Sequence, residues 1–179
     1  GGGIYNSQSM PTFTNCVFHG NDAIDGGGVF NADPSSSVNE PLFQHCIFNG
    51  NLAYSDGGGM HNFSISPVLT NCTFKENDAA LGGAIYSWNS SMPSISGSLL
   101  CGNMPNQISG SWEDNGDNTV SDSCAVCPDI NGDDIVNVSD LMIVFDQWGL
   151  SGSLADVTDD GIVNYADLLF IISNWGTCG

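Results

Sequence analysis

Two acidic segments in the last third of the chain have residue types and a spacing suited to binding a metal ion. The first, Asp129 to Asp140, reads DINGDDIVNVSD and places four aspartates in a short stretch. The second, Asp156 to Asp167, reads DVTDDGIVNYAD and repeats the pattern of the first. Carboxylates this close repel one another, and a divalent cation among their oxygens would cancel that repulsion.

Each segment matches a calcium-binding loop, in which oxygens come from positions 1, 3, 5, 7, 9 and 12. In the first segment the predicted ligands are Asp129, Asn131, Asp133, the Ile135 carbonyl, Asn137 and Asp140. In the second they are Asp156, Thr158, Asp160, the Ile162 carbonyl, Asn164 and Asp167. Two complete frames at matching positions predict two Ca²⁺ sites. The alternative is a pair of acidic turns that cap helices without binding metal.

The two loops differ at position six, where a calcium loop normally has glycine for its sharp turn. The second loop has Gly161 at this position, whereas the first has Asp134. Aspartate is among the few other residues that tolerate a left-handed backbone. We therefore expect the first site to be weaker than the second, or differently bent.

The composition of the chain limits the partners it can have. One basic residue, Lys75, and a formal net charge of −19 over 179 residues exclude nucleic acid as a partner, because both molecules would be polyanions. No apolar run approaches the length of about 20 residues that a transmembrane helix needs, so we expect no membrane span. Seven cysteines in a chain of this size favour an oxidising compartment, and hence an extracellular or cell-surface location.

The first two-thirds of the chain is a repeat. GGGIYN, GGGVFN, GGGMHN and GGAIYS begin at residues 1, 26, 57 and 82, and a second block with the pattern of PTFTNCVFHGN lies between them. Alternating apolar residues bounded by Gly, Asn and Asp indicate short strands. Units of this length cannot bury a face alone, so they must stack on their neighbours.

Stacking would align equivalent residues from one coil to the next at about 4.8 Å spacing. Such ladders would place apolar side chains inside and asparagines at a bend, where amide groups bond from coil to coil. The predicted apolar ladder is Phe18, Phe48, Phe74 and Leu100, and the predicted amide ladder is Asn21, Asn51, Asn77 and Asn103. The segment MPNQISGSWEDNGDN after Asn103 breaks the pattern, and we expect it to close one end of the stack.

The GGG and FxxN elements resemble those of right-handed parallel β-helix repeats in bacterial outer-membrane and surface proteins. The resemblance covers about residues 1–120. It implies a mainly β fold, with a short right-handed parallel β-helix of about four coils over residues 1–124. Gly1 opens in the middle of the pattern, so we interpret the chain as a processed or partial product whose first coil another chain or preceding sequence completes.

The duplicated loop, each copy followed by one apolar helical run ending in WG, resembles the type I dockerin module. This resemblance covers residues 127–179 and implies a small α-helical calcium-binding module over 125–179. In dockerins loop positions ten and eleven help to select the cohesin partner. Here these partner-contact candidates are Val138 and Ser139, and then Tyr165 and Ala166, which are not the usual hydroxyl pairs.

The cysteines form two groups. Cys127 and Cys178 bracket the second module, and Cys101 and Cys124 flank the closing segment, so both pairs are disulfide candidates. Cys16, Cys46 and Cys72 share one interior column, where we expect small buried apolar side chains. A zinc site in that column is the alternative, but successive coils present the three in a line and not as a tetrahedron.

Three classes of function compete for this sequence. Catalysis is disfavoured, because Lys75 alone is a poor source of the basic groups of a polysaccharide lyase and no paired carboxylates share adjacent coils. We expect a calcium-stabilised extracellular structural or adhesive protein that self-associates end to end into a surface layer or fibre. The alternative is a polysaccharide-binding or polysaccharide-degrading fragment that its dockerin attaches to a cohesin-type scaffold or another cell-surface partner.

Overall fold

The chain forms two compact units, Gly1–Cys124 and Ala125–Gly179. The structure is a computed structural model, and it describes residues 1–33, 40–124, 127–133, 135–158 and 160–177. Neither helix within these ranges is long and apolar enough to cross a membrane. Each unit has its own buried core, so the two are described separately.

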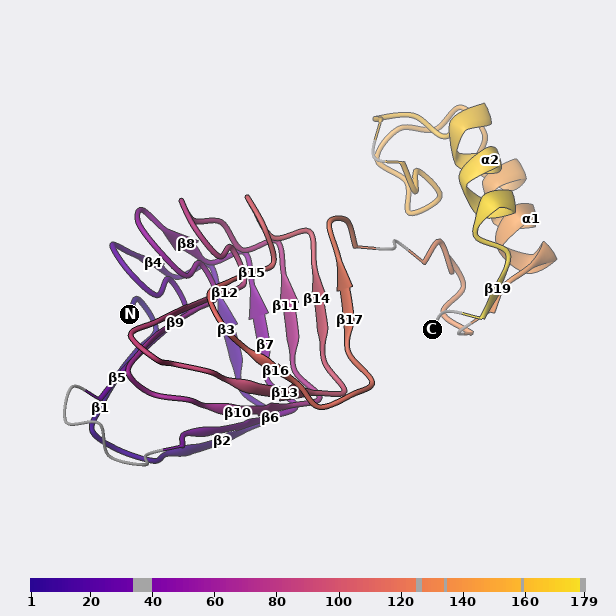
Figure 1. Cartoon of the computed structure of the whole chain (residues 1–179). Helices are drawn as coiled ribbons and strands as arrows, with labels where there is room; N and C mark the ends of the chain where they lie inside the picture. The colour runs from indigo at the N-terminus through magenta and orange to yellow at the C-terminus, as the bar shows by residue number, and fades with distance from the viewer. Residues whose placement is uncertain (34–39, 125–126, 134, 159, 178–179) are drawn as a thin grey trace. The chain divides into compact units, whose positions relative to one another are not determined.

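The first unit is a parallel β-solenoid of about four coils, built from three five-stranded sheets (Figure 1). Sheet 1 contains β1 (Ile4–Ser7), β5 (Val29–Ala32), β9 (Met60–Phe63), β12 (Ile85–Trp88) and β15 (Ile108–Ser109). Sheet 2 contains β2 (Thr12–Thr14), β6 (Leu42–Gln44), β10 (Val68–Thr70), β13 (Ser94–Ser96) and β16 (Glu113–Asp114). Sheet 3 contains β3 (Val17–His19), β7 (Ile47–Asn49), β11 (Thr73–Lys75), β14 (Leu99–Cys101) and β17 (Thr119–Ser121). At one corner β4 (Asp22–Ala23) pairs with β8 (Leu52–Ala53).

The apolar ladder of sheet 3 is confirmed. The register pairs Phe18 with Phe48, Phe48 with Phe74, and Phe74 with Leu100. Ring centroids lie 4.7 Å apart for the first pair and 4.3 Å apart for the second, with nearly parallel planes. Because all four side chains are buried, this column forms the centre of the solenoid core.

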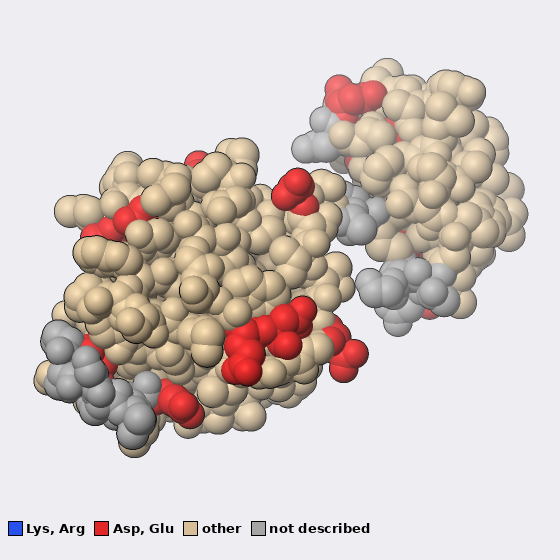
Figure 2. Space-filling view, viewed as in Figure 1, with Lys and Arg blue, Asp and Glu red and all other residues tan. Residues whose placement is uncertain are grey.

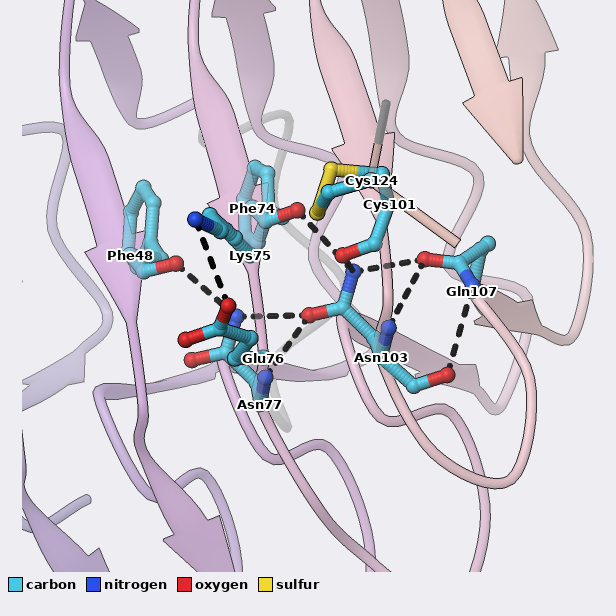
Figure 3. Close-up of a disulfide and its surroundings, with 9 residues drawn as sticks. All are labelled: Phe48, Phe74, Lys75, Glu76, Asn77, Cys101, Asn103, Gln107 and Cys124. Carbon is cyan, nitrogen blue, oxygen red and sulfur yellow. Dashed lines mark hydrogen bonds and ion pairs between the residues drawn. A yellow bond between two sulfur atoms is a disulfide. The ribbon is translucent and has the colours of Figure 1, made fainter. Parts of the chain in front are cut away.

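The predicted amide ladder is also confirmed. The side-chain amide of Asn21 donates to Asn51 Oδ1 at 2.9 Å, Asn51 donates to Asn77 Oδ1 at 2.8 Å, and Asn77 donates to Asn103 Oδ1 at 2.8 Å. The ladder ends on Gln107, whose Oε1 accepts from the Asn103 amide (Figure 3). Each asparagine therefore satisfies a buried group of the next coil and fixes the register between coils.

A second amide ladder lies in sheet 1 and was not predicted. Asn6 donates to Asn31 Oδ1 at 3.2 Å, and Asn31 donates to Asn62 Oδ1 at 2.9 Å. All three side chains are buried. The signal was present in the sequence, since an asparagine closes each of the first three GGG hexapeptides.

Glycine is required at this corner of the solenoid for two different reasons. Gly57 has a positive φ of 71°, the left-handed backbone expected at a tight corner. Gly58 is needed because its coil passes close to the next one, and an added Cβ would lie 2.5 Å from the carbonyl oxygens of Asp78 and Gly83. The recurrence of glycine triplets thus reflects backbone contact between coils as well as the turn itself.

The segment after Asn103 closes the stack by a different route from the one expected. It does not leave the pattern but adds the short strands β15, β16 and β17, one to each sheet. The side chains of β16 and β17 are all exposed. A disulfide joins Cys101 of β14 to Cys124, with the two Cα atoms 4.7 Å apart, and so holds the chain just after β17 (Figure 3).

Removing this disulfide should destabilise the last coil. The cysteines are separated by 23 positions in the sequence, and closing a loop of that size contributes about 3 kcal/mol in the chain-entropy model. We expect Cys101→Ser combined with Cys124→Ser to lower the free energy of unfolding by about that amount in urea denaturation. Hydrogen exchange should accelerate first in β17, and unchanged protection there would contradict this role.

The second unit is small and partly helical. It contains α1 (Val138–Asp146), α2 (Tyr165–Ser173) and an antiparallel pair formed by β18 (Ile135–Val136) and β19 (Gly176–Thr177). Its buried apolar residues are Val136, Val144, Ala155, Val163 and Ile171. Cys178 lies outside the described residues, so its predicted pairing with Cys127 stays a prediction.

Candidate metal centre

Each acidic loop leads directly into a helix. Asn137 and Asn164 are the N-cap residues of α1 and α2, and their side-chain oxygens accept from Ser139 N and Ala166 N. In the first turn of each helix, an aspartate accepts a bond from the backbone amide of the cap residue, completing a capping box. The loop geometry and the start of the helix are therefore fixed by the same side chains.

The carboxylates of each loop converge. One ligand atom from each of Asp129, Asp133 and Asp140 lies within 4.8 Å of the other two. Asp156, Asp160 and Asp167 form the same arrangement in the second loop. Three oxygens at this separation can occupy one coordination sphere of a hard cation, since Ca²⁺ binds oxygens at about 2.3–2.6 Å.

Asp140 closes the first loop from a buried position. Its Oδ1 accepts from Ile130 N at 2.8 Å and Asn131 N at 3.2 Å, and its Oδ2 accepts from Asn137 N at 2.9 Å. Burial by itself raises the pKa of Asp140, but the hydrogen bonds from Asn137, Asn131 and Ile130 outweigh it, so the pKa lies below its usual value. Asp140 is therefore held as a carboxylate.

Asp167 has the equivalent role in the second loop. Its Oδ1 accepts from the backbone amide and the hydroxyl of Thr158, at 3.0 and 2.9 Å, and its Oδ2 accepts from Asn164 N at 2.8 Å. Burial raises the pKa of Asp167, and the bonds from Asn164 and Thr158 lower it further than burial raises it. Thr158 thus supports Asp167 directly, in addition to its predicted position in the loop.

The remaining predicted ligands also lie around these carboxylates. In the first loop the amide nitrogen of Asn137 donates to the Ile135 carbonyl at 3.0 Å, and Asn131 donates to Asp133 Oδ2 at 3.0 Å. In the second loop the amide of Asn164 donates to the Ile162 carbonyl and to Asp160 Oδ2, both at 2.9 Å. In both loops the oxygens at positions five and seven thus accept from the side-chain amide nitrogen of the asparagine at position nine.

The low pKa of Asp140 predicts a stability difference that depends on pH. A carboxylate whose folded pKa is depressed stabilises the fold above its unfolded pKa of about 4, and this contribution is lost as the pH falls through the folded pKa. Without metal, Asp140→Asn should therefore be less stable than the wild type at about pH 7, and the gap should shrink below about pH 4. Urea denaturation across this range measures the gap, and a gap independent of pH would contradict the prediction. Asp146→Asn, which alters an exposed acid on α1 outside the loops, is the control.

The predicted partner-contact residues lie at the first turns of the helices. Val138 and Ser139 open α1, Tyr165 and Ala166 open α2, and all four are exposed. The backbone amides of Ser139 and Ala166 also donate to the helix caps at 2.7 Å. These positions are thus accessible, and their backbone is held rigidly by the loops.

Sequence reasoning missed a larger apolar surface on both helices. It interpreted the runs after the loops as apolar helices, but many of these side chains remain exposed. The exposed apolar residues occur in pairs at equivalent positions of the two repeats: Val138 and Tyr165, Met142 and Leu169, Phe145 and Ile172, and Trp148 and Trp175. This exposed apolar stripe, which runs along α1 and α2 and ends at the tryptophan just beyond each helix, could have been found by asking how many such residues so small a core can bury.

The chain has many more acidic than basic side chains. On the face drawn in Figure 2, Asp and Glu side chains gather in several separate patches and no Lys or Arg is visible. Lys75, the one basic side chain, pairs with Glu76 at 3.2 Å. Cations are therefore the ions that this surface attracts.

No protein-family model, curated protein or solved structure matches the chain. The solenoid, the two carboxylate clusters and the exposed apolar stripe are therefore the features that bear on its function.

Proposed function

We propose that the protein is an extracellular structural or adhesive β-solenoid whose second unit is a calcium-stabilised docking module similar to a type I dockerin. The observation that carries the proposal is the pairing of two carboxylate clusters with two helices that expose matching apolar residues. Two bound cations would order the helix starts, and the ordered helices would present one surface to a protein partner.

Calcium is the cation that suits these loops best. The side-chain and carbonyl groups placed at the loop positions offer only oxygen, which favours Ca²⁺ or Mg²⁺ over zinc or copper. Six ligand positions in one loop, with a carboxylate at the twelfth, suit the larger and less regular coordination sphere of calcium. Magnesium retains several of its waters and rarely occupies such a cage.

The exposed apolar stripe supports docking to a protein. Trp148 is 47% exposed and Trp175 is 53% exposed, and Met142, Phe145 and Ile172 are also largely exposed. Tryptophan, tyrosine, phenylalanine and methionine are enriched at protein interfaces, and a contiguous apolar surface of this kind is costly to leave in water. A partner that covers the stripe on α1, on α2 or on both would remove that cost.

The solenoid supports a structural role. Its coils are fixed by amide ladders and by stacked phenylalanines within a continuous buried apolar core. Its last coil ends in short edge strands and is held by a disulfide, and short edge strands limit further pairing. A disulfide at this place also suits an oxidising, extracellular location.

A pull-down with an immobilised cohesin domain tests the docking part of the proposal. The full chain should be retained in calcium and released by EDTA. The variant Phe145→Ser with Ile172→Ser should lose retention, because it removes matching residues of the stripe without touching a loop. The control is Val17→Ser, which changes an exposed apolar residue of the solenoid and should be retained normally.

Electron microscopy and light scattering test the structural part. The full chain in millimolar calcium should form end-to-end assemblies if the second unit of one molecule binds the solenoid of the next. Dispersed monomers in calcium, together with cohesin retention, would leave docking to another protein as the function and remove self-assembly.

A further inference from the structure

The chain contains three Asn–Gly pairs, in which the asparagine side chain can lose its amide group. They are Asn49–Gly50, Asn115–Gly116 and Asn131–Gly132. In such a pair the glycine backbone nitrogen can attack the asparagine Cγ carbon, because glycine has no side chain to hinder the approach. Asparagine is a chemically labile residue for this reason, and the structure around each pair decides how fast the reaction runs.

The pair Asn49–Gly50 is held by the stack of coils. The Gly50 nitrogen donates to the Lys75 carbonyl oxygen at 3.0 Å, so it belongs to the backbone bonding between coils. Asn49 ends β7, and its Oδ1 atom is buried. Attack by the Gly50 nitrogen therefore requires that a bond of the solenoid breaks first.

The pair Asn131–Gly132 is held by the first acidic loop. The Gly132 nitrogen donates to Asp129 Oδ1 at 2.8 Å, and Asn131 Oδ1 accepts from the Asp133 nitrogen at 2.9 Å. The backbone nitrogen of Asn131 donates to Asp140 Oδ1 at 3.2 Å. These bonds hold both reacting groups in place, so the loop protects this asparagine.

The pair Asn115–Gly116 lies in the turn between β16 and β17. Both residues are exposed, and a Cβ atom added to Gly116 would meet no atom within 4 Å. The Gly116 nitrogen donates to Asp114 Oδ1 at 3.0 Å, and Asp114 is an exposed residue next to the same turn. Breaking this bond disturbs no pairing between coils. This pair is therefore the most open of the three to attack.

The neighbours of this pair can move the protons that the reaction requires. Asp114 Oδ1 accepts from the Gly116 nitrogen and so lies where it can take the proton of the attacking atom. Hydrogen bonds from Gly116 and Asn118 lower the pKa of Asp114, which is therefore a carboxylate at neutral pH. The amide nitrogen of Asn115, the atom that must leave, donates to Ser94 Oγ at 2.6 Å.

We propose that Asn115 is a self-modification site, at which the chain converts this asparagine to aspartate or isoaspartate. The Gly116 nitrogen forms a bond to Asn115 Cγ while its proton passes to the Asp114 carboxylate. The Cγ–Nδ2 bond then breaks, and the nitrogen leaves as ammonia with that proton, which gives a five-membered succinimide ring. Water adds to either carbonyl carbon of the ring and opens it. The reaction consumes one water molecule and needs no oxidant or cofactor.

The modification loosens the last coil. The Asn115 nitrogen donates to the Ile95 carbonyl oxygen at 2.8 Å, and the Gly116 carbonyl oxygen accepts from the Gly97 nitrogen at 3.0 Å, so both residues are bonded to the preceding coil. Isoaspartate adds one carbon to the backbone and displaces these groups. The new carboxylate also repels that of Asp114. The site is independent of the docking function proposed above.

Peptide mass spectrometry of the aged protein tests the site. The calcium-saturated full chain is incubated at about pH 7 for several weeks. Chromatography then separates the asparagine, aspartate and isoaspartate forms of each peptide. We expect Asn115 to react at least tenfold faster than Asn49 and Asn131. Equal rates at the three pairs, or a faster rate at either of the other two, would overturn the proposal.

Matched variants test the role of Asp114. Asp114→Asn keeps an oxygen that accepts from the Gly116 nitrogen but removes the base, and it should slow the loss of the Asn115 amide at least threefold. Asp117→Asn removes an exposed charge from the same turn and should change the rate less than twofold. A reaction in Asp114→Asn that is as fast as in the wild type would overturn the proposal. Circular dichroism of each variant verifies that the solenoid is intact.

Hydrogen exchange measures the effect on the last coil. Exchange in β16 and β17 should accelerate as the wild type ages. It should stay constant in Asn115→Gln, because the longer side chain closes its ring much more slowly. Unchanged exchange in wild-type protein that carries isoaspartate would overturn the loosening of this coil.

Discussion

Replacing Asn77 with leucine will destabilise the solenoid by about 4 kcal/mol, because it leaves several buried polar groups without a partner. Asn77 Oδ1 accepts from the backbone amide and the side-chain amide of Asn51, at 3.0 and 2.8 Å, and its own amide donates to Asn103 Oδ1 and Phe48 O. Leucine has nearly the same size but makes none of these bonds. Each group left unsatisfied costs about 1–3 kcal/mol, and Asn51 N loses the side-chain acceptor that it has in the wild type.

The control for this change is Asn115→Leu. Asn115 is exposed, and its amide donates to a single partner, Ser94 Oγ. We expect Asn115→Leu to alter the free energy of unfolding by no more than about 0.5 kcal/mol, as is usual for surface changes. Urea denaturation of the two variants gives the comparison. Similar losses in both would mean that the ladder acts through shape alone and not through its hydrogen bonds.

The two predicted ladders could be recognised because stacked coils bring residues at equivalent positions of the repeat into contact. Once four repeats align, a residue such as Phe48 must lie between its equivalents Phe18 and Phe74, whatever the details of the corners. The same reasoning predicted the bonds between Asn51 and Asn77, because stacking places the asparagine at each bend next to its equivalent on the next coil. The repeat period alone therefore predicts these contacts between coils, and the structure of the loops need not be known.

The outer face could not be predicted in this way. Whether His61 is buried depends on how the turns of Asp25 and Asp56 fold over sheet 1, and those turns differ in length between coils. The final coil was missed for a related reason. Its strands β15 and β16 are each only a dipeptide, too short for an apolar pattern to be recognised, and only pairing with β12 and β13 defines them.

The spacing of the loop residues predicted the carboxylate clusters but not which helix side chains are buried. Loop positions one, five and twelve predicted which aspartates would meet, because a calcium-type loop that ends in a helix brings these positions together. The same spacing says nothing about which side chains the small second core can hold. Val144 and Ile171 are buried, whereas Phe145 and Ile172, their neighbours in the chain, are exposed. That outcome depends on the packing of α1 and α2.

We expect removal of the proposed calcium ions to unfold the second unit and to leave the solenoid intact. If each cluster binds one Ca²⁺ at a hundred times its dissociation constant, the two ions together stabilise this unit by about 5 kcal/mol. EDTA removes this stabilisation by calcium. It also restores the repulsion among the three carboxylates of each cluster, whose ligand atoms lie within 4.8 Å of one another. Five apolar residues are fully buried in the core of the described part of this unit, so the loss is large relative to its own stability. We expect the helical CD signal to fall on adding EDTA while the β signal of the solenoid remains.

Variants distinguish ion binding from a general effect of charge. Asp160→Asn should remove about half of the calcium-dependent stabilisation, because it takes one carboxylate from the second cluster and leaves the first intact. Asp146→Asn removes an equal charge outside the loops and should retain the full calcium response. Gly161→Asp should weaken the second site specifically, since Gly161 has a φ of 96° that aspartate adopts only with strain. Identical melting temperatures of the wild type in calcium and in EDTA would exclude calcium as the ion that stabilises these loops.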